Sequence, residues 1–366
     1  MSVVIFDVDG VFLSEERCFD VAALSVHELL FNPRYLNLTQ EKFKTSYTDE
    51  EIAEIRSKIF LDDKVLSRYK EMGLNSNWDM LYISFSIIYI NLLQDSGINI
   101  SNVNINNLYE MGEMLGDAEP DYGKVLEFLD GDEYTKETIY EGLVNYATSL
   151  KYLNEKDDFR TNSKLWHLGQ HIYQEWYLGS ERMRKKDSDL PIEGDKEGFL
   201  HQEEWLAPVE KIETMLKNLL DADQTIGIAT GRSREETLIP FEAAGLLKYF
   251  EDPRISTASE VKEAEGQKGV DRQLSKPHPY SYLWTLYEQN EAYFEESIKG
   301  ENVSEEKVYV VGDSVADYFC AEKMEVEFIG TLTGLTGDDI IPTFTDLGVQ
   351  RDNLVPDVLH VESLVK

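Results

Sequence analysis

The sequence predicts an α/β protein: a doubly wound parallel sheet with a large, mainly α-helical domain inserted after the first strand. A short apolar run rich in β-branched residues at positions 3–6 (VVIF) is followed by a long stretch of helical periodicity, from residue 18 to about residue 205. Beyond residue 208, short apolar runs alternate with amphipathic segments, which is typical of βαβ units. The strand at the start of the chain therefore has its expected sheet partners near the end of it.

The first strand is expected at residues 3–6, because a continuous apolar run rich in Val and Ile is typical of a buried parallel strand. Later apolar runs predict further strands at residues 225–230, 254–259, 307–314 and 326–332. Helical periodicity between them predicts helices at residues 209–222, 235–250, 279–294 and 316–324. Pro240 is a candidate kink or early end in the second of these helices.

The inserted segment predicts a helical domain, with helices at residues 21–30, 50–61, 122–129, 138–153 and 165–178. We expect residues 1–14 and 206–366 to form the sheet domain and residues 15–205 to form the helical domain. The most apolar stretch, residues 78–93, is shorter than a membrane-spanning helix and contains Asp79, so it predicts a buried core helix.

Composition narrows the possible partners and location. The chain has 35 Lys and Arg against 70 Asp and Glu, a formal net charge of −35. Such a surface argues against nucleic-acid binding, and an anionic substrate would need local positive charge at its site. Without a predicted signal peptide or CxxC pair, and with Cys18 and Cys320 as the only cysteines, we expect a cytoplasmic protein without a membrane partner.

Polar residues follow three predicted strands, where ligands of parallel sheets bind. Phosphoryl transfer would use such residues: a carboxylate attacks phosphorus, a second carboxyl group serves as acid and base, and a hydroxyl and an ammonium hold the phosphoryl oxygens. Mg²⁺ would offset the repulsion between carboxylate and phosphate. The candidates are Asp7, Asp9, Thr230, Gly231, Arg232, Lys276, Asp313, Ser314 and Asp317.

Each motif alone has a simpler interpretation. The DVDG segment could be placed in a calcium loop, but a strand precedes it where a helix should be. The TGRS segment could be a turn with Ser233 as a helix cap, and Lys276 could be a surface lysine. The occurrence of all the motifs in order, at predicted strand ends, favours a common site.

FDVDG, ATGRS, SKPHP and VGDSVAD resemble the four ordered motifs of the haloacid dehalogenase superfamily. The resemblance implies a Rossmann-like core and an aspartyl-phosphate mechanism in which Asp7 is the nucleophile and Asp9 is the general acid and base. The presence of Asp9 favours phosphoryl transfer over dehalogenation. Thr230, with Gly231 and Arg232, would bind the phosphoryl group, and Lys276 would orient Asp7.

The same resemblance implies Mg²⁺, bound by Asp7, Asp313 and the backbone carbonyl of Asp9. Asp317 and Ser314 would support the metal or the lysine. The insertion resembles the helical cap of phosphoglycolate phosphatase-like and β-phosphoglucomutase-like enzymes, but it is much longer than usual. The expected function is hydrolysis of a small phosphorylated metabolite.

Other functions remain open from the sequence. A phosphomutase would use the same core and return the phosphoryl group to its substrate. A phospho-ligand sensor would bind without turnover, and an interaction protein would use the helical insertion to hold a partner. A basic cluster at residues 182–186 could attract an anion, although cations at a helix C-terminus are the favoured interpretation.

Overall fold

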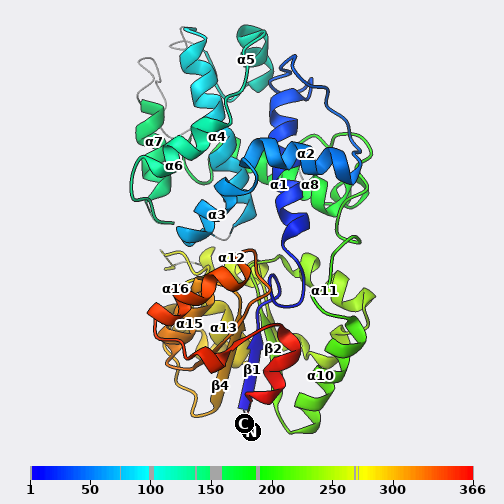
Figure 1. Ribbon diagram of the computed structural model, residues 1–366, viewed down its shortest axis with the longest axis vertical. Helices are drawn as coiled ribbons and strands as arrows, with labels where there is room; N and C mark the ends of the chain where they lie inside the picture. Colours follow the sequence, from blue (N-terminus) through cyan, green and yellow to red (C-terminus); the bar gives the residue numbers. More distant parts are fainter. Residues whose placement is uncertain are drawn as a thin grey trace. The chain divides into compact units, whose positions relative to one another are not determined.

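The computed structural model describes residues 2–74, 76–98, 103–136, 138–148, 159–186, 190–267, 269–270 and 272–365. The chain divides into two compact units (Figure 1). Met1–Glu15 and Leu200–Lys366 form one, here named the sheet unit, and Glu16–Phe199 forms the other, named the helical unit. None of the helices in the described part of the chain combines the length and the apolar character needed to cross a membrane.

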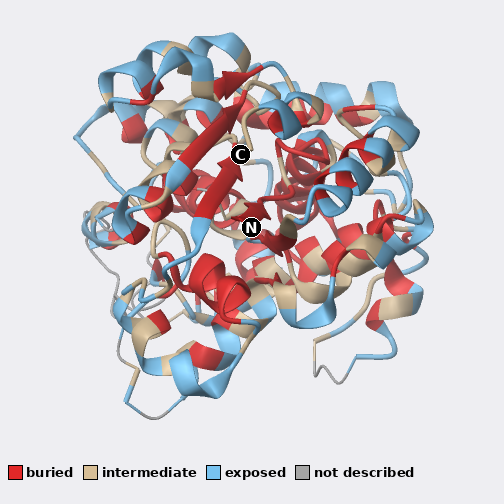
Figure 2. Cartoon of the chain, turned by 90° about the horizontal axis from the view of Figure 1, so that it is seen from below, coloured by how far each residue is buried: buried red, intermediate tan, exposed pale blue. Residues whose placement is uncertain are grey.

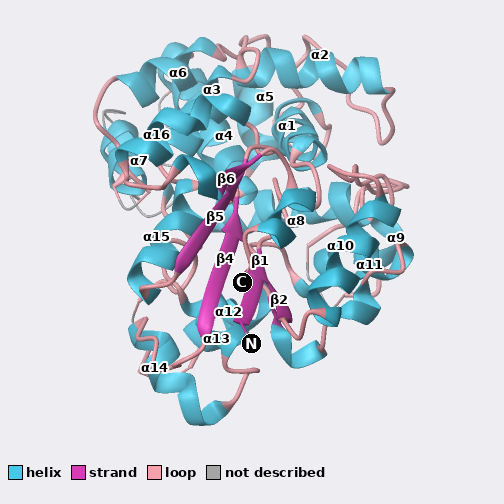
Figure 3. Cartoon of the chain, turned by 60° about the horizontal axis from the view of Figure 1, so that its bottom comes forward, coloured by secondary structure: helices cyan, strands magenta, loops and turns pink. Residues whose placement is uncertain are grey.

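The sheet unit contains a six-stranded sheet in which all neighbouring strands are parallel (Figure 3). The order of the strands is β3-β2-β1-β4-β5-β6, which confirms the predicted α/β class. The last strand has only two residues and was not predicted from the sequence. The strands are β1 (Ser2–Phe6), β2 (Thr225–Ala229), β3 (Ile255–Ser256), β4 (Lys307–Gly312), β5 (Glu327–Thr331) and β6 (Leu354–Val355).

Strand β1 lies between β2 and β4, so the beginning of the chain completes a sheet built from its second half (Figure 1). Val4 and Phe6 pack into an apolar cluster on one face, and Val3 and Ile5 pack into a second cluster on the other. All four side chains are fully buried, and the strands are largely red in Figure 2. Burial on both faces explains why this strand is a continuous apolar run.

The helices and strands of the sheet unit largely follow the predicted pattern, with corrections to two helices and one strand. The helix predicted at residues 279–294 ends at Leu286, because Glu288 and Gln289 adopt positive φ. The helix predicted at 235–250 passes Pro240 and ends at Ala243, and the strand predicted at 254–259 has only two residues because a helix starts at Ala258. The helices are α10 (Val209–Asp221), α11 (Arg234–Ala243), α12 (Ala258–Glu265), α13 (Tyr280–Leu286), α14 (Phe294–Lys299), α15 (Val315–Met324) and α16 (Ile341–Asp346).

The helical unit confirms the helical insertion after β1. Its most apolar helix, α4, is buried continuously from Met80 to Leu93, as a core helix requires. Of the helix predicted at 138–153, the structure describes Ile139–Thr148 as helical, and residues 149–153 lie outside the described residues. The helices are α1 (Glu16–Phe31), α2 (Asp49–Phe60), α3 (Lys64–Glu71), α4 (Asn77–Asp95), α5 (Leu108–Leu115), α6 (Gly123–Asp130), α7 (Ile139–Thr148), α8 (Lys164–Leu178) and α9 (Ser180–Met183).

Candidate active site

The strand register brings three of the sequence motifs to one edge of the sheet. Phe6 pairs with Ile228 of β2 and Val311 of β4. Asp7 is the next residue, and its backbone N–H donates to the Val311 carbonyl at 2.8 Å. It therefore leaves the sheet where β2 and β4 also end. Thr230 and Asp313 follow those two strands directly.

Lys276 lies between two carboxylates of this edge. Its Nζ is 3.0 Å from Oδ2 of Asp7 and 2.7 Å from Oδ1 of Asp317. The side chain of Lys276 is 9% exposed, and that of Asp317 is fully buried. The ammonium is thus held between two carboxylates with little access to water, where ion pairs are screened least.

Burial and charge shift the pKa values of all three groups. Burial raises the pKa of Asp7 to about 7, against the opposing effect of Lys276. Burial also disfavours the charge on Lys276, but Asp317 and Asp7 outweigh it and raise the pKa of the ammonium. For Asp317, the charge and hydrogen bonds of Lys276 outweigh burial and lower its pKa. Lys276 is therefore a stable cation, whereas burial makes ionisation of Asp7 unfavourable unless a further positive charge lies beside it.

Tyr282 on α13 completes this cluster, and sequence reasoning missed it. Its hydroxyl donates to Oδ1 of Asp317 at 2.8 Å and accepts from Nζ of Lys276 at 3.1 Å. Ser314 donates to the other oxygen of Asp317 at 2.6 Å and caps helix α15. Both oxygens of Asp317 are thus occupied by neighbouring donors. Nothing in the local sequence distinguishes Tyr282 from the other aromatic residues of its helix.

Asp313 lies in a space that two glycines keep open. A Cβ added at Gly10 would come within 2.2 Å of Oδ2 of Asp313, and one at Gly334 within 2.1 Å. Gly10 also has φ +69°, which allows the chain to turn directly after Asp9. The turn is held by Thr331 and Thr333, whose hydroxyls donate to the Gly10 carbonyl at 3.1 and 2.6 Å. Gly334 and the two threonines were not predicted as part of the site.

The carboxylates of Asp7, Asp313 and Asp317 form a cluster that could hold a metal ion. Each offers an oxygen, and these atoms lie within 4.8 Å of one another. Hard oxygen donors of this kind suit Mg²⁺. The cluster carries more negative charge than Lys276 offsets, and a divalent cation would also favour the ionised form of Asp7. The donor set therefore fits the metal that the sequence motifs imply.

The segment after β2 places Thr230 and Arg232 at the same edge. Thr230 is 1% exposed, and its hydroxyl accepts from the backbone N–H of Arg232 at 3.2 Å. Gly231 between them is exposed, and no atom of the described residues lies within 4 Å of a Cβ added there. The guanidinium of Arg232 contacts Asp9 and Glu203. Burial raises the pKa of Glu203, although Arg232 opposes this effect.

The basic cluster at residues 182–186 lies in the helical unit, at and beyond the end of α9. Lys185 pairs with Glu181 at 3.1 Å, and Arg184 lies 3.5 Å from Asp195. Both cations are exposed, so these pairs contribute little to stability. Neighbouring carboxylates offset part of the charge that could attract an anion.

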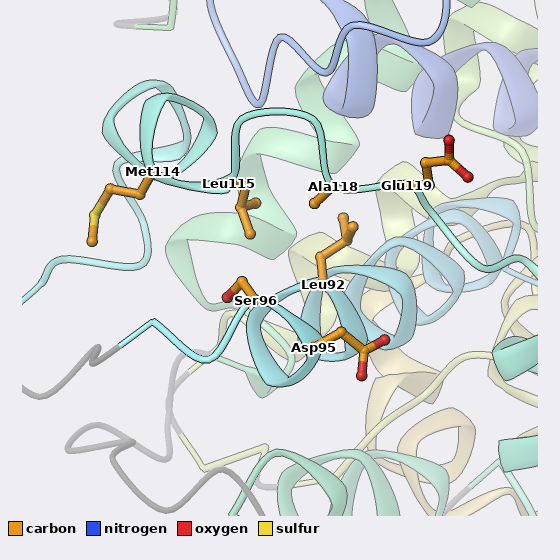
Figure 4. A pocket seen from close by; sticks show the side chains of 7 residues that line it. All are labelled: Leu92, Asp95, Ser96, Met114, Leu115, Ala118 and Glu119. Atoms are coloured by element: carbon orange, nitrogen blue, oxygen red, sulfur yellow. The ribbon is translucent and has the colours of Figure 1, made fainter.

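The helical unit also contains a cavity of about 320 Å³ between the C-terminal end of α4 and α5 (Figure 4). Its described lining includes the carboxylates of Asp95 and Glu119 and no cationic side chain. An anionic ligand would be repelled there. The remaining lining residues are Leu92, Ser96, Met114, Leu115 and Ala118.

Comparison with known proteins places the chain in a family. Residues 177–331 match the family model described as haloacid dehalogenase-like hydrolase. A crystal structure of a structural genomics target is 40% identical to the chain, covers 100% of it and 98% of its own length, and has a TM-score of 0.80. No curated protein matches the sequence. The chain belongs to the haloacid dehalogenase-like hydrolases.

Two more distant structures are similar over nearly the whole of both chains. One, described as a β-phosphoglucomutase from Thermotoga maritima, is 13% identical with a TM-score of 0.39, and covers 100% of this chain and 98% of its own. The other, described as a phosphoglycolate phosphatase from Lactobacillus plantarum, is 12% identical with a TM-score of 0.43, and covers 100% and 99%. Similarity at this level carries no argument about the activity of this chain.

Proposed function

We propose that this hydrolase is a Mg²⁺-dependent phosphatase that removes the phosphoryl group of a small metabolite through an aspartyl-phosphate on Asp7. The observation that carries the proposal is that Asp7 contacts the Lys276 ammonium at 3.0 Å and also has an oxygen within 4.8 Å of one from Asp313. A buried carboxylate beside a fixed cation and a candidate metal site is suited to attack an anionic phosphorus centre. We place the enzyme in the reducing cytoplasm, in keeping with the buried thiols of Cys18 and Cys320.

Asp7, Asp313 and the backbone carbonyl of Asp9 would hold the metal. When bound, Mg²⁺ would neutralise part of the charge shared by the carboxylates and the phosphoryl oxygens. Asp317 has a different part, because Lys276, Tyr282 and Ser314 already contact its two oxygens. Its part is to hold the lysine in place.

The chain's own groups would carry the two chemical steps. Oδ2 of Asp7 forms a bond to phosphorus while the ester oxygen departs with the bonding electrons and takes a proton from Asp9. Asp9 then accepts a proton from water, whose oxygen displaces Asp7 from phosphorus. Thr230 and the backbone N–H groups that follow it would bind the phosphoryl oxygens. The deep burial of Asp7 and Thr230 favours a compact phosphate monoester.

Trapping of the intermediate tests the proposal. Crystals soaked with Mg²⁺ and beryllofluoride should show the fluoride complex on Asp7, within hydrogen-bond distance of Thr230 and Lys276. Incubation with a panel of phosphorylated metabolites should release inorganic phosphate from at least one of them. A fluoride complex bound elsewhere, or no phosphate release from any member of the panel, would contradict the proposal. Transfer of the phosphoryl group to a second substrate hydroxyl would identify a mutase instead.

A further inference from the structure

Arg232 connects two carboxylates that come from opposite ends of the helical insertion. Its Nε and Nη2 donate to Oδ1 of Asp9 at 2.8 and 2.5 Å. Its Nη1 donates to Oε1 of Glu203, and Nη2 lies 3.3 Å from Oε2 of the same carboxylate. Glu203 is thus contacted through both of its oxygens, and Asp9 is held by two donors on the single oxygen Oδ1. A lysine, which lacks the planar fork of donors, could not make both sets of contacts in one fixed geometry.

The cluster of Arg232, Glu203 and Asp9 is largely buried. The side chains of Arg232 and Glu203 are 4% and 3% exposed, whereas that of Asp9 is 19% exposed. A buried carboxylate such as Glu203 is tolerated only when a cation compensates it. Asp9 is the member of the cluster that reaches solvent, as a group that exchanges protons with a ligand must.

The backbone holds Glu203 beside the turn that carries Asp9. The segment before the helical unit and the segment after it are joined by backbone hydrogen bonds. The Ser14 N–H donates to the Glu204 carbonyl at 2.8 Å, and the Leu206 N–H donates to the Phe12 carbonyl at 2.9 Å. The Gly10 N–H in turn donates to Leu13 at 2.8 Å. Glu203 therefore lies in a segment that is hydrogen-bonded to the segment following the Asp9 turn.

The contacts from Arg232 give the two oxygens of Asp9 different roles, one in anchoring the side chain and one in proton transfer. Nε and Nη2 of Arg232 converge on Oδ1, and among the described residues this leaves Oδ2 as the oxygen for proton transfer. A carboxyl group on a short turn would otherwise rotate, and an acid that is misplaced by about 1 Å can lose about 10²-fold in rate.

We propose that Arg232 and Glu203 are positioning residues of the reaction: Arg232 fixes Oδ1 of Asp9 so that Oδ2 meets the leaving oxygen, and Glu203 fixes Arg232. The inference rests on the proposed phosphatase function. It replaces the phosphate contact expected for Arg232, because a phosphate would have to displace two carboxylates from the guanidinium.

Two aryl phosphates of nearly equal size separate positioning of the acid from phosphate binding. 4-Nitrophenyl phosphate has a leaving group that needs little protonation, whereas phenyl phosphate needs the acid. Arg232→Ala should lower kcat/KM for phenyl phosphate by about 10²-fold and that for 4-nitrophenyl phosphate by less than about 5-fold. Arg234→Ala is the matched control, since Arg234 pairs with Asp252 and Glu260, and both substrates should be unaffected.

The same variant should also reveal the second step. With Asp9 misplaced as a base, 4-nitrophenyl phosphate should release a burst of nitrophenol equal to the enzyme concentration, followed by slow turnover. If Arg232 instead binds phosphate, KM should rise equally for both substrates and no burst should appear. That result would overturn the inference.

A double-mutant cycle tests the part played by Glu203. Glu203→Ala should cause the same substrate-dependent loss, and combining it with Arg232→Ala should add little, because the two residues act as one unit. If the fold losses of the two single variants multiply in the double variant, the proposed coupling between Arg232 and Glu203 is wrong. If Arg232→Ala does not fold, Arg232→Met combined with Glu203→Gln removes both charges and keeps the volume, and it should give the same ratio between the substrates.

The wild-type enzyme distinguishes failure of this inference from failure of the proposed function. If it hydrolyses neither aryl phosphate with Mg²⁺, the proposed function fails and this inference falls with it. If it hydrolyses both and the variants lose equal activity on each, the proposed function stands and the positioning role is refuted.

Discussion

Nζ of Lys276 lies 3.0 Å from Oδ2 of Asp7, although the two residues stand in distant parts of the sequence. The sheet order brings them together, because β1 inserts between strands formed by the second half of the chain. The same ammonium contacts Asp317 at 2.7 Å. Asp7, the proposed nucleophile, is thus a buried carboxylate whose charged form is disfavoured by burial and stabilised by Lys276.

Asp7→Asn should separate activity from stability. The variant should lose at least about 10³-fold in kcat, because an amide cannot form the phospho-intermediate. Its melting temperature without metal should be equal to or higher than that of the wild type, because burial makes the charged form of Asp7 costly. Phosphate release and calorimetry measure the two effects. Persistent turnover in the purified variant would refute the nucleophile assignment.

Tyr282→Phe should disturb the lysine without changing any charge. Loss of the hydroxyl that contacts Lys276 and Asp317 should lower kcat by between about 10- and 100-fold. It should also cost about 1–3 kcal/mol in the free energy of unfolding. Tyr287→Phe is the control, since its hydroxyl accepts from the Val303 N–H at 2.7 Å. The control should lose stability and keep its kcat; equal kcat losses in both variants would contradict a specific role for Tyr282.

Gly334→Ala should weaken metal binding. Its new Cβ would come within 2.1 Å of Oδ2 of Asp313 and push the carboxylate away. Calorimetric titration with Mg²⁺ should show a Kd at least about 10-fold higher than in the wild type. Gly266→Ala is the control, because its Cβ would be 3.4 Å from the closest neighbouring atom. Unchanged Mg²⁺ affinity in Gly334→Ala would exclude Asp313 as a metal ligand.

His27 should make the protein sensitive to acid. Burial lowers its pKa to about 4, although Glu41 opposes this effect. Between pH 6.5 and about 4, the unfolded chain binds a proton at His27 that the folded chain does not. The contribution of His27 is therefore fully present above pH 6.5 and decreases as the pH falls towards 4.

His27→Phe removes the imidazole that binds this proton and keeps an aromatic ring beside Phe31 and Tyr47. Between pH 7.5 and 5, the free energy of unfolding of the full chain should fall by roughly 2 kcal/mol less in this variant than in the wild type. Urea unfolding followed by fluorescence measures it. His167→Gln, at an exposed position, should behave as the wild type. Parallel pH dependence in His27→Phe and the wild type would refute the role of His27.

The sequence predicted the elements that have strong local patterns. The β-branched run of β1 and the amphipathic periods of α10 and α15 were recognised because each pattern is complete within a few residues. The predicted helix at 279–294 was too long, because its helical period continues through Glu288 and Gln289, where the backbone adopts left-handed φ values. Strand β6, with two residues, has no periodicity to detect.

The sequence by itself determined the family, the parallel sheet, the helical insertion and the polar residues that end the strands, because each is encoded in a short segment. Only the tertiary structure decided which other groups join them. Tyr282, Gly334 and Glu203 reach the site through contacts between segments far apart in the chain. Such contacts depend on strand order and on how side chains fill the space between elements, and neither leaves a local pattern in the sequence.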